Sequence, residues 1–95
     1  MPTQAELLHP EMQLPLIHLN GNSPQNLGGQ YWEALRVLNE LQEKFSKIEF
    51  HARDYYPLGD EVWLKARAQR EVQKANIASL RKYLDAHAAH CFESY

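Results

Sequence analysis

The sequence DEVWLKARAQREVQKANIASLRKYLDAHAAHCF, residues 60–92, contains neither proline nor glycine and is rich in alanine. Asp60 can cap a helix and Glu61 favours the positive end of one, so we expect a helix over about 60–92. Such a helix is about 50 Å long at 1.5 Å per residue. Its apolar residues form two stripes, which predicts that different surfaces are buried along its length: Leu64, Ala68, Val72 and Ala75, then Ile77, Leu80, Leu84, Ala88 and Cys91.

A second helix is predicted upstream, over about residues 24–48. Ser23 provides an N-cap, and Pro24 suits the first helical position. Gly28 and Gly29 weaken the first turns by about 1 kcal/mol each relative to alanine, so either another backbone or a ligand is expected to approach closely there. One apolar stripe with steps of three and four residues follows: Tyr31, Ala34, Leu38, Leu41, Phe45 and Ile48.

The remaining segments are predicted to be non-helical. Residues 12–22 are expected to form an extended arm, because Pro15 excludes a helix and the leucines and the isoleucine need a surface to cover them. Residues 1–11 are expected to be a mobile tail. We therefore predict an all-α fold in which two long antiparallel helices and the extended arm form one helical-hairpin domain, residues 12–95.

Two helices and one arm make a thin core for a chain of 95 residues. A chain of this size buries only about 60–65% of its unfolded surface on folding. Aromatic side chains also occur on more than one face of the predicted hairpin, among them Tyr31, Trp32 and Trp63. We therefore expect a homo-oligomer or a partner protein to cover part of the apolar surface.

Composition excludes several classes of protein. Ten Lys and Arg residues against twelve Asp and Glu residues give a formal net charge of -2, which argues against a nucleic-acid coat protein and makes nucleic acid an unexpected partner. The single cysteine excludes a disulfide framework. No apolar run is long enough to span a bilayer, and the first residues lack the pattern of a secretory signal. We expect no membrane association and a cytoplasmic location in the host cell.

The sequence carries no catalytic or cofactor-binding motif that we can identify. It has no GxSxG, P-loop, HExxH or dinucleotide glycine fingerprint, so we predict a protein that is not an enzyme and binds no cofactor. His87, His90 and Cys91 lie near one face of the long helix and have zinc-ligating side chains. The favoured interpretation is two solvated histidines near the negative helix end and a small apolar cysteine, with metal binding as the minority hypothesis.

The residues with the strongest functional signal are basic and aromatic. Trp63, Arg67, Arg70 and Lys74 follow steps of four, three and four, and so share one side of the second helix. The loop before that helix contains Arg53, Tyr55 and Tyr56 in the sequence ARDYYP. Arginine binds phosphate or carboxylate oxygens, and aromatic faces stack on planar rings. The alternative is structural: Arg53 pairs with a nearby acid and the tyrosines hold the loop against the helices.

Two segments resemble a group of short uncharacterised phage and prophage proteins. These segments are LPLIHLNG, residues 14–21, and ARDYYPLG, residues 52–59, and the resemblance extends over about residues 13–90. It implies a phage origin and no particular activity. In size and helical plan the chain is also similar to phage proteins that sequester nucleotide immune signals of the host, although it lacks their characteristic sequences.

These observations predict a non-catalytic phage anti-defence protein that binds and sequesters a small nucleotide-derived immune signal. Arg53, Arg67 and Arg70 are expected to hold phosphates, and Arg67 and Arg70 to do so without contributing to folding. Tyr55, Tyr56 or Trp63 would stack on the base, and His18 and Asn20 would bond the sugar or base edges. The alternative is a protein-directed inhibitor or adaptor that docks on a host defence protein.

Overall fold

The computed structural model describes residues 1–18 and 21–94, and all regular structure in these residues is helical. The elements are α1 (Gln4–Leu8), α2 (Pro24–Ser46), the short 3-10 helices η1 (Ala52–Asp54) and η2 (Tyr56–Leu58), and α3 (Asp60–Glu93). The all-α prediction is therefore confirmed. No helix in the described part of the chain is long and apolar enough to cross a membrane.

The ends of α2 and α3 follow local sequence signals. The Ser23 hydroxyl accepts a hydrogen bond from the Asn26 backbone N–H at 3.0 Å, and Pro24 occupies the first turn of α2. α3 begins after Gly59, whose φ of 112° is a conformation that favours glycine. Asp60 is therefore the first residue of α3 and not its cap, and its charge lies in the first turn, where the helix dipole favours an acid.

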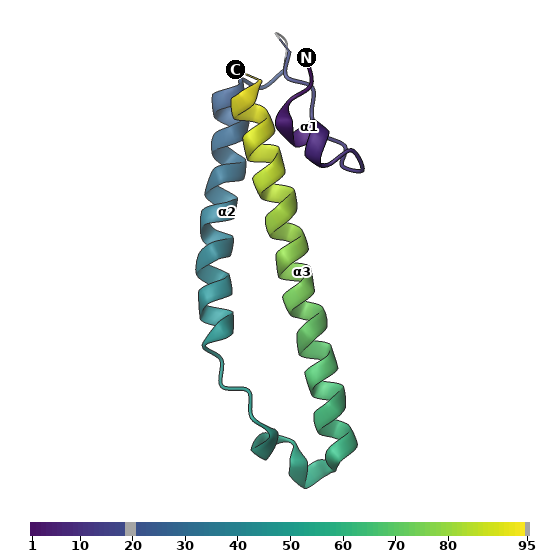
Figure 1. Ribbon diagram of the computed structural model, residues 1–95. Coiled ribbons are helices and arrows are strands. Elements are labelled where there is room, and N and C mark those ends of the chain that lie inside the picture. Colours follow the sequence, from purple (N-terminus) through teal and green to yellow (C-terminus); the bar gives the residue numbers. More distant parts are fainter. Residues whose placement is uncertain (19–20, 95) are drawn as a thin grey trace.

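Pairs of contacts along α2 and α3 show how the two long helices meet. Near the start of α2, the Tyr31 ring lies 4.8 Å from the His87 ring, close to the end of α3. At the end of α2, the Phe45 ring lies 4.7 Å from the guanidinium carbon of Arg70. In Figure 1 the chain descends through α2 and returns through α3 beside it. Between these contacts lies a small apolar cluster, whose buried members are Leu35, Leu38 and Leu84.

The N-terminal segment is folded onto α3, although residues 1–11 were expected to be a mobile tail. Thr3 caps α1 through a reciprocal capping box with Glu6. Ala5 from α1, Leu14 from the arm and Ala86 from α3 form a second buried apolar cluster. α1 thus lies on the opposite side of α3 from α2, which makes α3 the central element of the molecule (Figure 1).

The first apolar stripe of α3 does not face α2, contrary to our expectation that it is buried. Leu64 is 59% exposed and Val72 is 56% exposed, and Ala68 and Ala75 are exposed as well. The side that meets α2 and the loop contains Trp63, Ala66, Arg70 and Ile77 instead. The physical reason is that the planar guanidinium of Arg70 packs against aromatic rings at the end of α2, so this polar residue occupies an inward position.

Candidate functional site

The predicted binding residues lie at both ends of an elongated molecule. The dimensions are 61 × 24 × 18 Å. The arm that carries His18 leads into the start of α2, whereas η1 and η2 lie at the opposite end, beside the start of α3 (Figure 1). His18 is exposed, and its carbonyl accepts a hydrogen bond from the Gly21 N–H at 3.2 Å. Asn20 lies outside the described residues. Within one chain, His18 is therefore separate from the other candidates.

The RDYY loop combines a packed residue with exposed ones. The Tyr55 ring lies 5.6 Å from the Phe50 ring and 5.7 Å from the Trp63 ring, so Tyr55 holds the loop against α3. Arg53 is exposed on η1, and Tyr56 is 61% exposed on η2. The structural interpretation of the loop therefore applies to Tyr55, while Arg53 and Tyr56 present their side chains to solvent.

Arg70 has a structural position between α2 and α3. Its guanidinium carbon lies 4.7 Å from the ring centres of both Phe45 and Phe50. One guanidinium nitrogen also donates a hydrogen bond to the Phe45 carbonyl at 3.3 Å. This carbonyl belongs to the last turn of α2 and also accepts a hydrogen bond from the Ile48 backbone N–H at 3.2 Å. Phe50 was not among the candidates, because its contacts with Arg70 and Trp63 arise only when the connection packs against α3.

A groove between the end of α2 and α3 collects the basic candidates. Its volume is about 390 Å³, and Phe50, Trp63, Arg67, Arg70 and Lys74 are among the residues that line it. We call these five residues the basic groove. An adjoining cavity of about 280 Å³ shares Arg70 and Lys74 with it. The Phe50 and Trp63 rings are 4.9 Å apart and form an aromatic wall.

The electrostatics of the basic groove favour an anion. Arg67 lies with its guanidinium carbon 5.9 Å from the Trp63 ring centre and is exposed. Lys74 pairs with Glu71 at 3.4 Å, and Glu71 is the one acidic residue in the described lining. Because the Arg70 guanidinium already donates a hydrogen bond to the Phe45 carbonyl, Arg67 and Lys74 are the cations that remain most accessible to a ligand.

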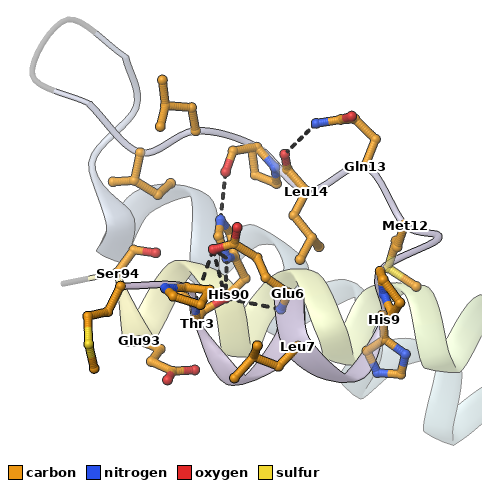
Figure 2. A pocket seen from close by; sticks show the side chains of 16 residues that line it. Thr3, Glu6, Leu7, His9, Met12, Gln13, Leu14, His90, Glu93 and Ser94 are labelled. Carbon is orange, nitrogen blue, oxygen red and sulfur yellow. Dashed lines mark hydrogen bonds and ion pairs between the residues drawn. The ribbon is translucent and has the colours of Figure 1, made fainter.

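A second cavity, of about 940 Å³, lies between the N-terminal segment and the end of α3, and sequence reasoning did not identify it (Figure 2). His90 is its central polar residue and is only 5% exposed. The His90 Nε2 lies 2.6 Å from the Pro15 carbonyl oxygen, and Nδ1 lies 2.8 Å from the Thr3 hydroxyl. We call Thr3, Glu6, Pro15 and His90 the His90 clasp.

The hydrogen bonds of the His90 clasp assign a role to each ring nitrogen. A carbonyl can only accept, so Nε2 carries the proton that faces Pro15. Nδ1 is hydrogen-bonded to the Thr3 hydroxyl, and the Glu6 carboxylate lies 3.7 Å from Nδ1. The Thr3 hydroxyl also accepts from the Glu6 backbone N–H at 3.2 Å, as the cap of α1. These contacts fix the N-terminal segment to α3.

The three possible zinc ligands near the C-terminus have separate structural partners. His87 lies with its ring 3.9 Å from the Tyr83 ring and its Nδ1 2.8 Å from the Tyr83 carbonyl oxygen. Cys91 is fully buried beside Gly28, and burial raises the pKa of its thiol. Among the described residues, no three His, Cys, Asp or Glu side chains come together in a way that could hold a metal ion.

Comparison with known proteins adds no relative: no family model, curated protein or solved structure matches this chain. The proposals below are therefore based on the geometry and the chemistry of its own residues.

Proposed function

We propose that the protein is a non-catalytic binding protein that captures a small, planar, phosphate-bearing ligand of the nucleotide type in the basic groove. The observation that carries this proposal is the position of Arg67 and Lys74 beside the aromatic wall of Phe50 and Trp63. Guanidinium and ammonium groups bind phosphate oxygens, and an aromatic wall can stack against a base.

Each residue of the basic groove has a distinct role in this proposal. Arg67 and Lys74 bind the phosphates, and Trp63 offers a ring face to the base. Arg70 lines both the basic groove and the adjoining cavity of about 280 Å³. It contributes positive charge from a fixed position, since its guanidinium packs against Phe45 and Phe50. Arg53 and Tyr56 lie on η1 and η2, next to the start of α3, and can contact a ligand that extends beyond the groove.

The biological setting of this proposal comes from the sequence resemblance. In a phage protein, capture of a nucleotide in the cytoplasm of the host would lower the free concentration of an immune signal without any chemical step. Such sequestration requires tight binding, and it does not require a catalytic group.

Calorimetry with a panel of cyclic nucleotides, cyclic dinucleotides and ADP-ribose derivatives tests the proposal. We expect at least one member to bind the wild-type protein, and Arg67→Glu to abolish that binding because it reverses the exposed charge beside the Trp63 ring. Lys65→Glu is the matched control, since Lys65 is an exposed cation of α3 outside the groove. Absence of binding tighter than the millimolar range across the panel would reject the proposal.

The second candidate function is docking on a host defence protein. It is favoured by exposed apolar side chains at the η2 end of the molecule, where Tyr56 is 61% exposed and Leu58 is 73% exposed. In this case Leu58→Ser removes inhibition of the host target, whereas Arg67→Glu leaves it intact. The two variants therefore separate the two functions.

A further inference from the structure

The face of α3 that points away from α2 is covered along only part of its length. Near the C-terminal end of α3, Ala86 and His90 lie beneath the N-terminal segment of the same chain. Toward the start of α3 the same face continues at helical spacing, and no described part of the chain covers it. Its residues are the exposed stripe Leu64, Ala68, Val72 and Ala75.

The accessible surface of one chain is larger than its mass predicts. The chain exposes 7214 Å², whereas a folded monomer of 11.1 kDa exposes about 5,700 Å². Its radius of gyration is 18.5 Å, against about 12 Å for a compact domain of this length. The surplus of about 1,500 Å² is in the range of what one subunit buries in a permanent homodimer.

We infer that two copies of this chain pair through the exposed stripe of α3, with the two helices antiparallel and a two-fold axis near Val72. The open part of this face extends from about Asp60 to Lys82, and Val72 lies close to its centre. A two-fold axis there places Ala68 opposite Ala75 of the second copy. Small side chains at both positions let the helices approach closely, and the interface is self-complementary, as a two-fold interface must be.

Charged residues beside the stripe are compatible with this pairing. The same axis places Glu61 opposite Lys82 of the second copy, so opposite charges meet at the ends of the interface, where Lys82 also pairs with Glu11 of its own chain at 3.4 Å. Glu71 flanks the axis in both copies, and its charge is already paired with Lys74 of its own chain at 3.4 Å. With this pairing, the start of the partner α3 lies where the N-terminal segment begins to cover α3.

The first test is the molar mass in solution. Light scattering at roughly 100 μM is expected to give about 22 kDa for the wild-type protein, twice the 11.1 kDa of one chain. Val72→Asp brings two carboxylates together at the axis and is expected to raise the dimer Kd at least roughly tenfold. Gln69→Asp is the matched control, since Gln69 is an exposed residue of α3 outside the stripe. A wild-type mass of one chain at this concentration would overturn the inference.

The second test fixes the direction of pairing and does not depend on a dissociated variant remaining folded. On mild oxidation, Val72→Cys is expected to form a disulfide-linked dimer. Ala68→Cys alone is expected to remain uncrosslinked, whereas Ala68→Cys combined with Ala75→Cys crosslinks. The native Cys91 is buried and provides the background level. Crosslinking by Ala68→Cys alone would show that the two helices are parallel. Absence of crosslinking by Val72→Cys would show that the copies pair through another surface. Either result contradicts the inference. Neither test involves the basic groove, so both are independent of the proposed function.

Discussion

At the scale of single residues, His90 connects three parts of the chain through one imidazole ring. Its two nitrogens reach Thr3 before α1 and Pro15 in the arm, while its backbone belongs to α3. A buried polar ring is stable only where its hydrogen-bonding groups have partners, and here both nitrogens have them. His90 therefore holds the N-terminal segment against α3 together with the apolar cluster of Ala5, Leu14 and Ala86.

Replacing His90 is expected to have a large effect on stability. His90→Ala removes two hydrogen bonds and leaves a cavity, which is expected to lower the free energy of unfolding by about 2–3 kcal/mol. Urea denaturation followed by circular dichroism measures this change. His51→Ala is the control, since His51 is exposed, and its effect is expected to stay within about 0.5 kcal/mol. Equal effects of the two variants would exclude the clasp as a stabilising contact.

Glu6 makes the His90 clasp sensitive to acid. The Thr3 backbone N–H donates to the Glu6 carboxylate at 3.1 Å, and this bond holds the pKa of Glu6 below its usual value. A lowered pKa means that Glu6 contributes its full stabilisation above its unfolded pKa of about 4.3 and loses it as the pH falls through the lower folded value. Thermal unfolding between neutral pH and pH 3 is expected to show this loss, and Glu6→Gln to reduce it. Glu49→Gln, at an exposed position, controls for net charge.

At the scale of elements, two close contacts at opposite ends hold α2 against α3. Near the start of α2, Gly28 packs against the Cys91 side of α3, which explains one of the two adjacent glycines by close packing of another helix. Near the end of α2, Arg70 packs between two phenylalanine rings and donates a hydrogen bond to the Phe45 carbonyl. The first contact predicts that Gly28 and Gly29 differ in their tolerance to substitution. The second contact predicts the same for Arg70 and Arg67.

Gly28 and Gly29 are expected to respond in opposite directions. A Cβ at Gly28 would lie 3.1 Å from the Cys91 Cβ, so Gly28→Val is expected to destabilise by about 1–3 kcal/mol through overpacking. A Cβ at Gly29 meets nothing within 4 Å, so Gly29→Ala is expected to stabilise by about 0.5–1 kcal/mol through helix propensity. Thermal melts of the two variants check both signs. Destabilisation by Gly29→Ala would show that this turn of α2 needs a glycine.

Arg67 and Arg70 are expected to separate binding from folding. Arg70→Ala removes the contact with the two rings and the bond to the Phe45 carbonyl, so a loss of about 1–2 kcal/mol in stability is expected. Arg67→Ala is expected to change stability by no more than about 0.5 kcal/mol and to weaken ligand binding. Urea denaturation and calorimetry on both variants measure the two properties. The packed position of Arg70 corrects the expectation that neither arginine contributes to folding.

At the scale of the whole molecule, the chain is a rod with too little core for its surface. The buried apolar residues gather in two small clusters, both toward the C-terminal half of α3. The other half of α3 packs against α2 and the loop on one side and is exposed on the other. A second copy along this exposed side would lengthen the apolar core over the whole of α3.

The size of the particle in solution follows from the inferred pairing. With the axis near Val72, α3 extends about 30 Å to its C-terminal end, so a pair with its terminal segments measures about 65–75 Å. Small-angle scattering is expected to show this maximum dimension for the wild type and about 61 Å for a monomeric Val72→Asp variant. A dimension above about 100 Å would indicate association end to end and contradict the prediction.

The helices themselves were determined by sequence signals that act within a few residues. The cap at Ser23, the glycine at position 59 and the absence of proline from residues 60–93 are local, and they place α2 and α3 within two residues of the predicted ends. The predicted proximity of the RDYY loop to Trp63 is also local, since the loop leads directly into α3. These features required no knowledge of distant contacts.

The tertiary structure alone decided which faces meet. The stripe that contains Val72 and the side that contains Arg70 both follow helical spacing, so periodicity did not show which of them faces α2. The Arg70 side faces inward because its guanidinium packs against the Phe45 and Phe50 rings. His90 forms hydrogen bonds with Thr3 and Pro15, which lie 87 and 75 positions away in the sequence. No local pattern indicates such distant partners. His18 lies apart from Arg53 for the same reason: the distance between segments depends on how long helices pack, which is settled by side chains far apart in the chain.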